Sequence, residues 1–164
     1  MIFFDTSAIV KAYVNERGSP LVHAAIARMK GRLYLTVAVA LEVLSTLARQ
    51  RRAGDLTQAG YRSARTEFLQ ALGGSLKLLE VHLTEFATGY ELVDRHRQIG
   101  AGAMDVLHVA SALRLQAANQ GELLLVASSD HGFLSFARAV GLRTFDPETA
   151  NLAALLDLTR SATN

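Results

Sequence analysis

Short apolar stretches with strand character alternate along this chain with longer stretches in which the apolar residues have helical spacing. The candidate strands are residues 1–4, 33–36, 77–81, 123–127 and 142–145. The candidate helices are residues 7–15, 20–29, 38–53, 57–72, 84–99 and 103–119. Strands that alternate with helices are typical of a parallel sheet covered on both faces. The pattern therefore predicts an α/β fold.

Composition limits the classes of protein to which the chain can belong. A chain of 164 residues is long enough for one compact core, and we expect residues 1–164 to form a single domain. Cysteine is absent, which excludes disulfides, zinc–thiolate sites and thiol nucleophiles and fits the reducing cytoplasm. No apolar run approaches the roughly 20 residues that span a bilayer. We therefore expect a soluble, cytoplasmic protein without a membrane partner.

Two of the predicted strands run directly into an aspartate beside hydroxyl residues. Residues 2–4 are followed by Asp5-Thr6-Ser7, and residues 123–127 are followed by Ser128-Ser129-Asp130. In an open parallel sheet the functional crevice lies outside the carboxyl ends of the strands. Asp5 and Asp130 are therefore expected to be neighbours at that edge.

Two further acids, Glu42 and Asp105, lie within apolar helical stretches, where a buried charge is costly unless it is paired or binds a cation. Glu42 follows the second strand by about one and a half helical turns, which brings its carboxylate back to the same edge. Asp105 lies in the first turn of its helix, where an anion is stabilised. Four gathered carboxylates repel one another unless a divalent ion neutralises them, and oxygen ligands favour Mg²⁺, with Mn²⁺ as a substitute.

Each of these acids also has an interpretation that needs no metal. Asp5 could cap a helix, Asp105 could be an ordinary first-turn acid, Asp130 could be a turn residue and Glu42 could be an exposed helix position. The common placement of all four at strand ends favours the metal site over four separate explanations.

Histidine and arginine residues give weaker signals. His108 lies three residues after Asp105, on a similar helix face. We interpret it as a core histidine with satisfied hydrogen bonds, because metals that select oxygen rarely need imidazole. Arg49, Arg51 and Arg52 form the densest basic patch, which is either a solvated helix end or a contact for a nucleic-acid backbone.

Several stretches occur together in a recognisable order. They are residues 5–11 with Glu16, Thr36 with Glu42 six residues later, residues 104–113, and residues 128–130 followed by 139–142. In this order and spacing the chain resembles the PIN-domain ribonucleases, and most closely the VapC-type toxins of prokaryotic toxin–antitoxin pairs. The fourth stretch has Ser128 where that family usually has threonine.

The resemblance implies a three-layer α/β/α sandwich with a central parallel sheet, and an endoribonuclease dependent on Mg²⁺ or Mn²⁺. It implies that the acidic quartet of metal ligands and catalytic residues is Asp5, Glu42, Asp105 and Asp130. Asp130 is the acid that could act through water instead of binding the metal directly. Ser7 and Ser128 match the hydroxyl positions of the family, where they would hydrogen-bond ligands or position water.

The resemblance also implies partners. They are an RNA substrate, a second copy of the chain in a homodimer, and a small cognate antitoxin whose C-terminal segment occupies a groove near the active site. Residues 20–29 and 38–53 could line that groove or the dimer contact. The alternative is a non-catalytic or degenerate PIN-like protein that binds RNA or a protein partner around a structural metal ion. The presence of all four acids argues against such a loss of activity.

Overall fold

A five-stranded parallel sheet forms the centre of the molecule, in the order β3-β2-β1-β4-β5. The computed structural model describes residues 1–160. The strands are β1 (Ile2–Phe4), β2 (Leu33–Thr36), β3 (Leu76–Leu79), β4 (Leu125–Ala127) and β5 (Arg143–Phe145). All four pairings are parallel. The predicted α/β class and the central parallel sheet are confirmed.

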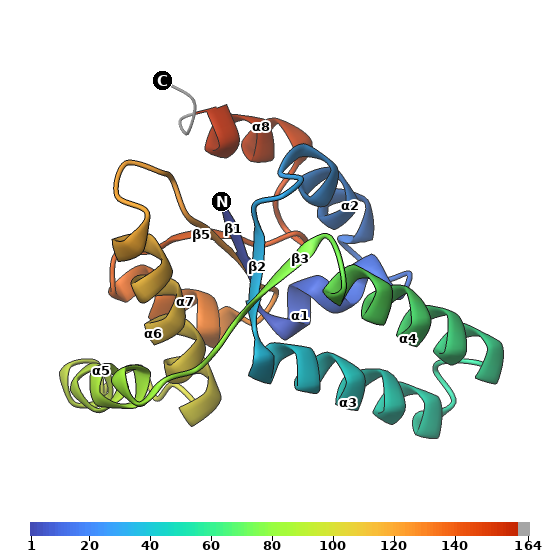
Figure 1. Ribbon diagram of the computed structural model, residues 1–164, viewed down its shortest axis with the longest axis horizontal. Helices are drawn as coiled ribbons and strands as arrows, with labels where there is room; N and C mark the ends of the chain where they lie inside the picture. Colours follow the sequence, from blue (N-terminus) through green and yellow to red (C-terminus); the bar gives the residue numbers. More distant parts are fainter. Residues whose placement is uncertain (161–164) are drawn as a thin grey trace.

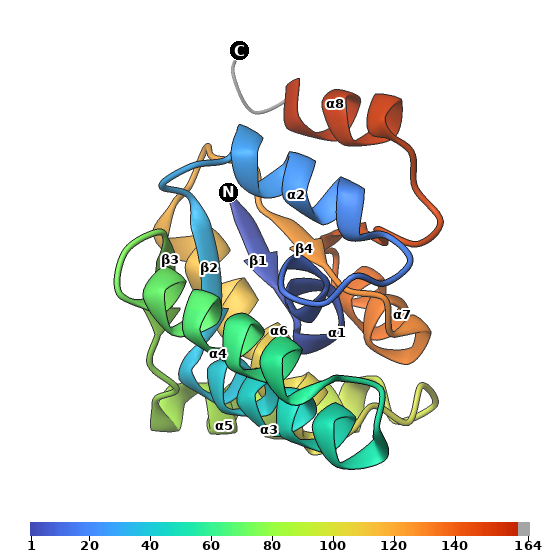
Figure 2. The same ribbon diagram turned by 90° about the vertical axis from the view of Figure 1, so that its right-hand side faces the viewer.

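Helices cover both faces of the sheet, which gives the three layers of an α/β/α sandwich (Figures 1 and 2). On one face lie α1 (Thr6–Ile9) with the 3₁₀ turn η1 (Val10–Ala12), α2 (Ser19–Arg28), α3 (Val37–Ala53) and α4 (Gln58–Leu72). On the other lie α5 (Leu83–Arg95), α6 (Ala103–Ala118) and α7 (His131–Ala139). The last described helix, α8 (Leu152–Arg160), packs against α2. Within the described residues, no helix combines the length and apolar character of a membrane span.

The buried strands supply a separate core to each face of the sheet. Ile2 and Phe4 belong to the core beneath α1 to α4, whereas Met1 and Phe3 belong to the core beneath α6 and α7. The alternation arises because successive side chains of a strand point to opposite faces. Both sets are buried, as expected for a parallel sheet covered on both sides.

Helix α7 was not predicted, because Asp130 and Gly132 read as turn residues. In the structure Asp130 is the N-cap of α7, and its carboxylate accepts the Phe133 N–H at 2.9 Å. Phe133, Phe136 and their apolar neighbours form a buried face. The apolar spacing of a helix was therefore present, and the capping residue was mistaken for part of a turn. Helix α8 was also missed.

Two predicted helices are shorter than their apolar patterns. The helix predicted at residues 84–99 ends at Arg95, and the chain then turns to Gly100, whose φ of 66° favours glycine. The helix predicted at residues 7–15 is instead α1 followed by η1, which ends at Ala12. Apolar spacing located these segments, but their ends depend on how the chain leaves the helix.

Strand order determines where a site can form. The chain passes from β1 outward to β2 and β3, and later returns to the opposite side of β1 to add β4 and β5. The direction of winding therefore reverses between β1 and β4. Crevices that bind ligands in such sheets lie at the carboxyl ends of the strands on either side of this reversal. Asp5 directly follows β1, and Ser128 directly follows β4.

Candidate metal centre

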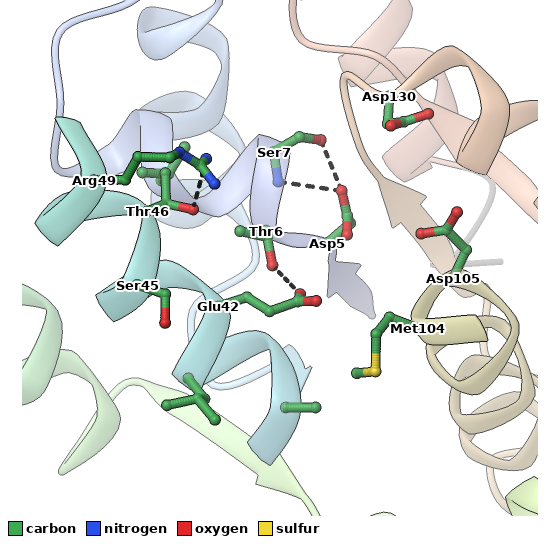
Figure 3. Close-up of a pocket in the computed structure, with 13 residues that line it drawn as sticks. Asp5, Thr6, Ser7, Glu42, Ser45, Thr46, Arg49, Met104, Asp105 and Asp130 are labelled. Carbon is green, nitrogen blue, oxygen red and sulfur yellow. Dashed lines mark hydrogen bonds between the residues drawn. The ribbon is translucent and has the colours of Figure 1, made fainter. Parts of the chain in front are cut away.

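A pocket of about 580 Å³ opens at this edge of the sheet (Figure 3). All four acids of the predicted quartet line it: Asp5, Glu42, Asp105 and Asp130. They come from four different places in the fold, namely the end of β1, helix α3, the start of α6 and the start of α7. The structure therefore brings together the residues that the sequence placed at one edge.

Asp5 is the most firmly held of the four acids. It is buried, and its backbone N–H donates to the Ala127 carbonyl at 2.9 Å, which extends the pairing of β1 with β4. Its Oδ2 atom accepts three hydrogen bonds: from the Ser7 N–H at 3.1 Å, from Ser7 Oγ at 2.7 Å and from Ser128 Oγ at 2.8 Å. The first of these bonds makes Asp5 the N-cap of α1. Asp5 therefore caps a helix, as the interpretation without metal expected, and also lines the pocket.

Ser7 and Ser128 join the ends of β1 and β4 beneath Asp5. Their hydroxyl oxygens lie 2.9 Å apart. Ser7 Oγ accepts the Ser129 N–H at 2.8 Å, and Ser128 Oγ accepts the Asp130 N–H at 3.0 Å. Each hydroxyl therefore accepts a hydrogen bond from a backbone N–H and donates one to Asp5. Of the two roles predicted for these serines, this geometry favours holding a ligand over positioning water.

Glu42 reaches from α3 toward Asp5 (Figure 3). Its Oε2 atom accepts hydrogen bonds from Thr6 Oγ1 at 2.5 Å and from His108 Nε2 at 3.1 Å. The hydrogen bond from His108 is the main reason that the pKa of Glu42 lies below its ordinary value, and the Thr6 bond acts in the same direction. Burial opposes this shift without reversing it. Glu42 is therefore held in its ionised form.

Asp105 and Asp130 stand at the N-termini of α6 and α7. Asp105 Oδ2 accepts the Gly102 N–H at 3.2 Å, and Asp130 Oδ1 accepts the Phe133 N–H. Burial raises the pKa of Asp105, and the nearby charges of Asp5 and Asp130 raise it further. Gathering these carboxylates without a cation therefore disfavours the ionised form of Asp105, as predicted for clustered acids.

One arrangement is common to the four carboxylates. In each, one oxygen accepts hydrogen bonds from the protein, and no donor within the described part of the chain bonds to the other oxygen. Mg²⁺ and Mn²⁺ prefer oxygen ligands, and Mg²⁺ typically binds through one or two carboxylates and retains several waters, so these four oxygens are more than one such ion needs. The donor set therefore fits a hard divalent cation. The residues whose possible ligand atoms lie within 4.8 Å of one another are Asp5, Glu42 and His108; among the described residues, Asp105 and Asp130 lie outside this compact group.

His108 is buried beside this set, with 1% of its side chain exposed. Its Nδ1 atom lies 3.2 Å from Thr36 Oγ1 and its Nε2 atom bonds to Glu42. The prediction of a core histidine with satisfied hydrogen bonds agrees with this environment. Its contact with Glu42 was missed, because the spacing in sequence pointed to Asp105.

The remaining wall of the pocket comes from α3 and the start of α6. Arg49 lines it and donates from Nη2 to Thr46 Oγ1 at 3.3 Å. Arg51 instead bonds to Gln58 and, like Arg52, is not among the lining residues. Exposed apolar side chains of Leu41 and Met104 also line the pocket. These two residues gave no signal in the sequence, since single apolar residues at helix surfaces are common.

The family of the chain follows from comparison with known domains. The family model described as PIN domain matches residues 2–139. This chain belongs to the PIN domain family. The match spans β1 to α7 and therefore includes all four acids of the pocket.

Solved structures share this PIN fold. FitAcB from Neisseria gonorrhoeae is 18% identical, with 92% of this chain and 100% of that chain covered and a TM-score of 0.67. VapC20 of Mycobacterium tuberculosis, described as a sarcin–ricin loop cleaving toxin, is 18% identical over 87% of this chain and 96% of that chain, with a TM-score of 0.62. VapBC2 from Rickettsia felis, bound to a promoter DNA fragment, is 15% identical, with 89% of this chain and 98% of that chain covered and a TM-score of 0.61. At these identities the likeness concerns the fold. Comparison with curated proteins by sequence found no match.

Proposed function

We propose that this PIN-domain protein is a metal-dependent endoribonuclease of the VapC type, which a cognate antitoxin inhibits. The observation that carries the proposal is the pocket at the reversal between β1 and β4, where four carboxylates each keep one oxygen without a hydrogen bond from any residue in 1–160. Family membership supports a nuclease activity, and the pocket supplies residues suited to it.

The residues of the chain would divide the work of binding a cation. Asp5 and Glu42 are held by hydrogen bonds in the positions of ligands, and Asp105 and Asp130 lie on the other side of the pocket (Figure 3). A bound Mg²⁺ or Mn²⁺ ion would supply activation of water and neutralisation of the charge that develops on the phosphate. Ser7 and Ser128 keep Asp5 in place during this reaction. The expected products carry 5′-phosphate and 3′-hydroxyl ends.

Single-stranded RNA is the substrate class that the pocket wall fits. Arg49 provides a cation for a backbone phosphate, and Leu41 and Met104 provide apolar surface against which an unstacked base can pack. The description of VapC20 as a toxin that cleaves an RNA loop supports the same class. The earlier assignment of Arg51 and Arg52 to RNA contact loses support, because neither lines the pocket.

An antitoxin would reach the pocket along α3. Of the two segments predicted to form a groove or a dimer contact, α3 lines the pocket, whereas α2 packs against α8. Solved structures with a similar fold include FitAB and VapBC2, both bound to DNA, which supports an antitoxin partner for this chain. We expect the antitoxin segment to contact α3 and to exclude RNA.

A homodimer would use a different surface from the predicted one. Leu83, Phe86, Tyr90 and Val93 are exposed and lie at spacings of three and four residues, along one side of α5. Exposed apolar rows of this kind mark protein contacts. Tyr90→Glu should convert the dimer to a monomer, and the mass in solution measured by light scattering would check this; a wild-type monomer would refute the dimer.

The decisive test is cleavage of single-stranded RNA by the purified chain with Mg²⁺, with chelator, and after the substitutions Asp5→Ala or Asp105→Ala. We expect cleavage only by the wild-type protein with metal. Activity that survives both substitutions or the chelator would overturn the assignment of this pocket. Absence of cleavage in the wild-type protein, with RNA binding retained, would favour the degenerate PIN-like alternative.

A further inference from the structure

Behind the pocket, a chain of hydrogen bonds links α3 with α6. Thr36, at the end of β2, accepts the Val39 N–H at 3.1 Å and thereby caps α3. The Thr36 hydroxyl lies 3.2 Å from His108 Nδ1, and His108 Nε2 lies 3.1 Å from Glu42 Oε2. Thr36 is fully buried and His108 is 1% exposed. The proposed function gives this buried histidine no role.

The hydrogen bonds determine which nitrogen of His108 carries the proton. Glu42 Oε2 is a carboxylate oxygen and can only accept, so Nε2 of His108 is the nitrogen that donates to it. Thr36 Oγ1 accepts the Val39 N–H and keeps its own hydroxyl proton, which it donates to Nδ1. Both ring nitrogens are thereby engaged. A ring nitrogen of His108 lies close to the possible ligand atoms of Asp5 and Glu42. Because both ring nitrogens are used in hydrogen bonds, His108 has no lone pair left to bind a metal.

The donors to Glu42 converge on a single oxygen. Thr6 and His108 both bond to Oε2, from α1 and α6, on two sides of α3. A glutamate side chain has considerable rotamer freedom, and fixing it costs conformational entropy when a ligand binds. With Oε2 held at two points, that entropy is already lost in the folded protein. Oε1 remains the oxygen that can face a ligand.

We propose that His108 is a positioning residue, oriented by Thr36, that holds Glu42 so that only Oε1 is offered to a divalent cation. This inference rests on the proposed function, because it assumes that the pocket binds such a cation. Groups that orient metal ligands in this way typically contribute about 10- to 100-fold to metal affinity. His108 is therefore expected to act on metal binding itself, before any RNA is present.

The test is a titration of the protein with Mn²⁺ alone, followed by electron paramagnetic resonance, to give Kd. His108→Leu should weaken binding about 10- to 100-fold. His108→Gln, which keeps an N–H donor near the position of Nε2, should retain most of the wild-type affinity for Mn²⁺. His108→Asn, which reaches only toward Thr36, should resemble the leucine variant. Thermal unfolding of each variant checks that it is folded.

A double-mutant cycle separates positioning from general damage to the fold. In the Glu42→Ala background, His108→Leu should cause no further loss of affinity, because the residue that it positions is gone. Equal losses in both backgrounds, or wild-type affinity in His108→Leu, would overturn the inference while leaving the metal site intact. If His108→Leu does not fold, the glutamine and asparagine variants carry the test, and equal Kd values for them would overturn it. A wild-type protein that binds no Mn²⁺ would overturn the proposed metal site and this inference together.

Discussion

Asp5 and Glu42, on one side of the acidic pocket, accept hydrogen bonds from four side chains, whereas Asp105 and Asp130, on the other side, each accept one backbone N–H. The side-chain donors are Ser7, Ser128, Thr6 and His108. The backbone donors are Gly102 and Phe133. The carboxylates of the first side are therefore held by side chains from several parts of the fold. Those of the second are held by a backbone N–H at the start of their own helices, with Asp130 as the N-cap of α7 and Asp105 as the third residue of α6.

One acid on each side also differs in ionisation. Hydrogen bonding lowers the pKa of Glu42, so its charge stabilises the folded protein. Burial and the charges of Asp5 and Asp130 raise the pKa of Asp105, so its charge destabilises the folded protein. A bound cation would remove the destabilisation caused by the charge of Asp105 and leave the stabilisation that comes from the charge of Glu42. The pocket thus combines a preorganised half with one acid, Asp105, whose charge is destabilising without metal, as is common where function is placed above stability.

The largest expected effect is the loss of cleavage in Asp5→Asn and in Asp105→Asn. Each substitution removes one carboxylate while keeping nearly the same volume, and the loss of several kcal/mol of transition-state stabilisation lowers kcat/KM by about 1,000-fold or more. The same change at exposed Asp94 on α5 is the control and should leave cleavage unchanged. If Asp105→Asn retained activity, only the preorganised side would be catalytic.

Metal binding should stabilise the folded protein measurably. Mg²⁺ at about 100 times its Kd adds about 2.7 kcal/mol to the free energy of unfolding. For a chain of this size that is an increase in Tm of roughly 5–10 °C. Differential scanning fluorimetry with Mg²⁺ or chelator would measure it, and Asp5→Asn should abolish the increase. An equal shift in that variant would place the bound ion elsewhere.

Without metal, the two sides should respond oppositely to neutralisation. At pH 7 Asp105→Asn should increase the free energy of unfolding by up to about 1 kcal/mol, the range for partly exposed charges, whereas Glu42→Gln should decrease it. As pH falls, Asp105 of the wild type takes up its proton at a higher pH in the folded than in the unfolded state, which stabilises the folded protein, so the advantage of Asp105→Asn shrinks. The contribution of Glu42 is present above its ordinary pKa and is lost as pH falls through its lowered pKa. Urea denaturation at pH 7 and pH 4 in chelator would measure the free energy of unfolding of both variants. Changes of the same sign in the two variants would contradict the proposed difference between Asp105 and Glu42.

The smallest effect concerns Arg49, at the margin of the pocket. In an Asp5→Asn background, which prevents cleavage, Arg49→Ala should reduce the slope of log affinity for single-stranded RNA against log salt by about 0.7. Arg52→Ala is the matched control, because Arg52 does not line the pocket. Fluorescence anisotropy at several salt concentrations would measure both slopes. Equal reductions would indicate that the whole basic patch binds RNA.

The parts of the fold that depend on local pattern could be predicted from the sequence. The apolar run of β1 stops at Asp5, and parallel topology then requires that acid to meet the residues that follow β4. Asp105 was predictable from its place in a helical first turn. Glu42 followed from its distance beyond β2.

Other features depend on packing that a single sequence does not encode visibly. The contact between His108 and Glu42 requires α6 to lie against α3 at one particular angle and offset. The opposite directions of Arg49 and Arg51 depend on where α3 meets the pocket and where it meets Gln58. Helix α7 was missed for a local reason, since its N-cap resembles a turn.

The pairing of β1 with β4 has a consequence for synthesis of the protein. Asp5 leaves the ribosome long before Asp130, and the hydrogen bond from Asp5 to Ala127 cannot form until β4 has emerged. Contacts between such distant segments are also slow to form. A growing chain therefore cannot form the complete acidic pocket until β4 and the residues that follow it have been made.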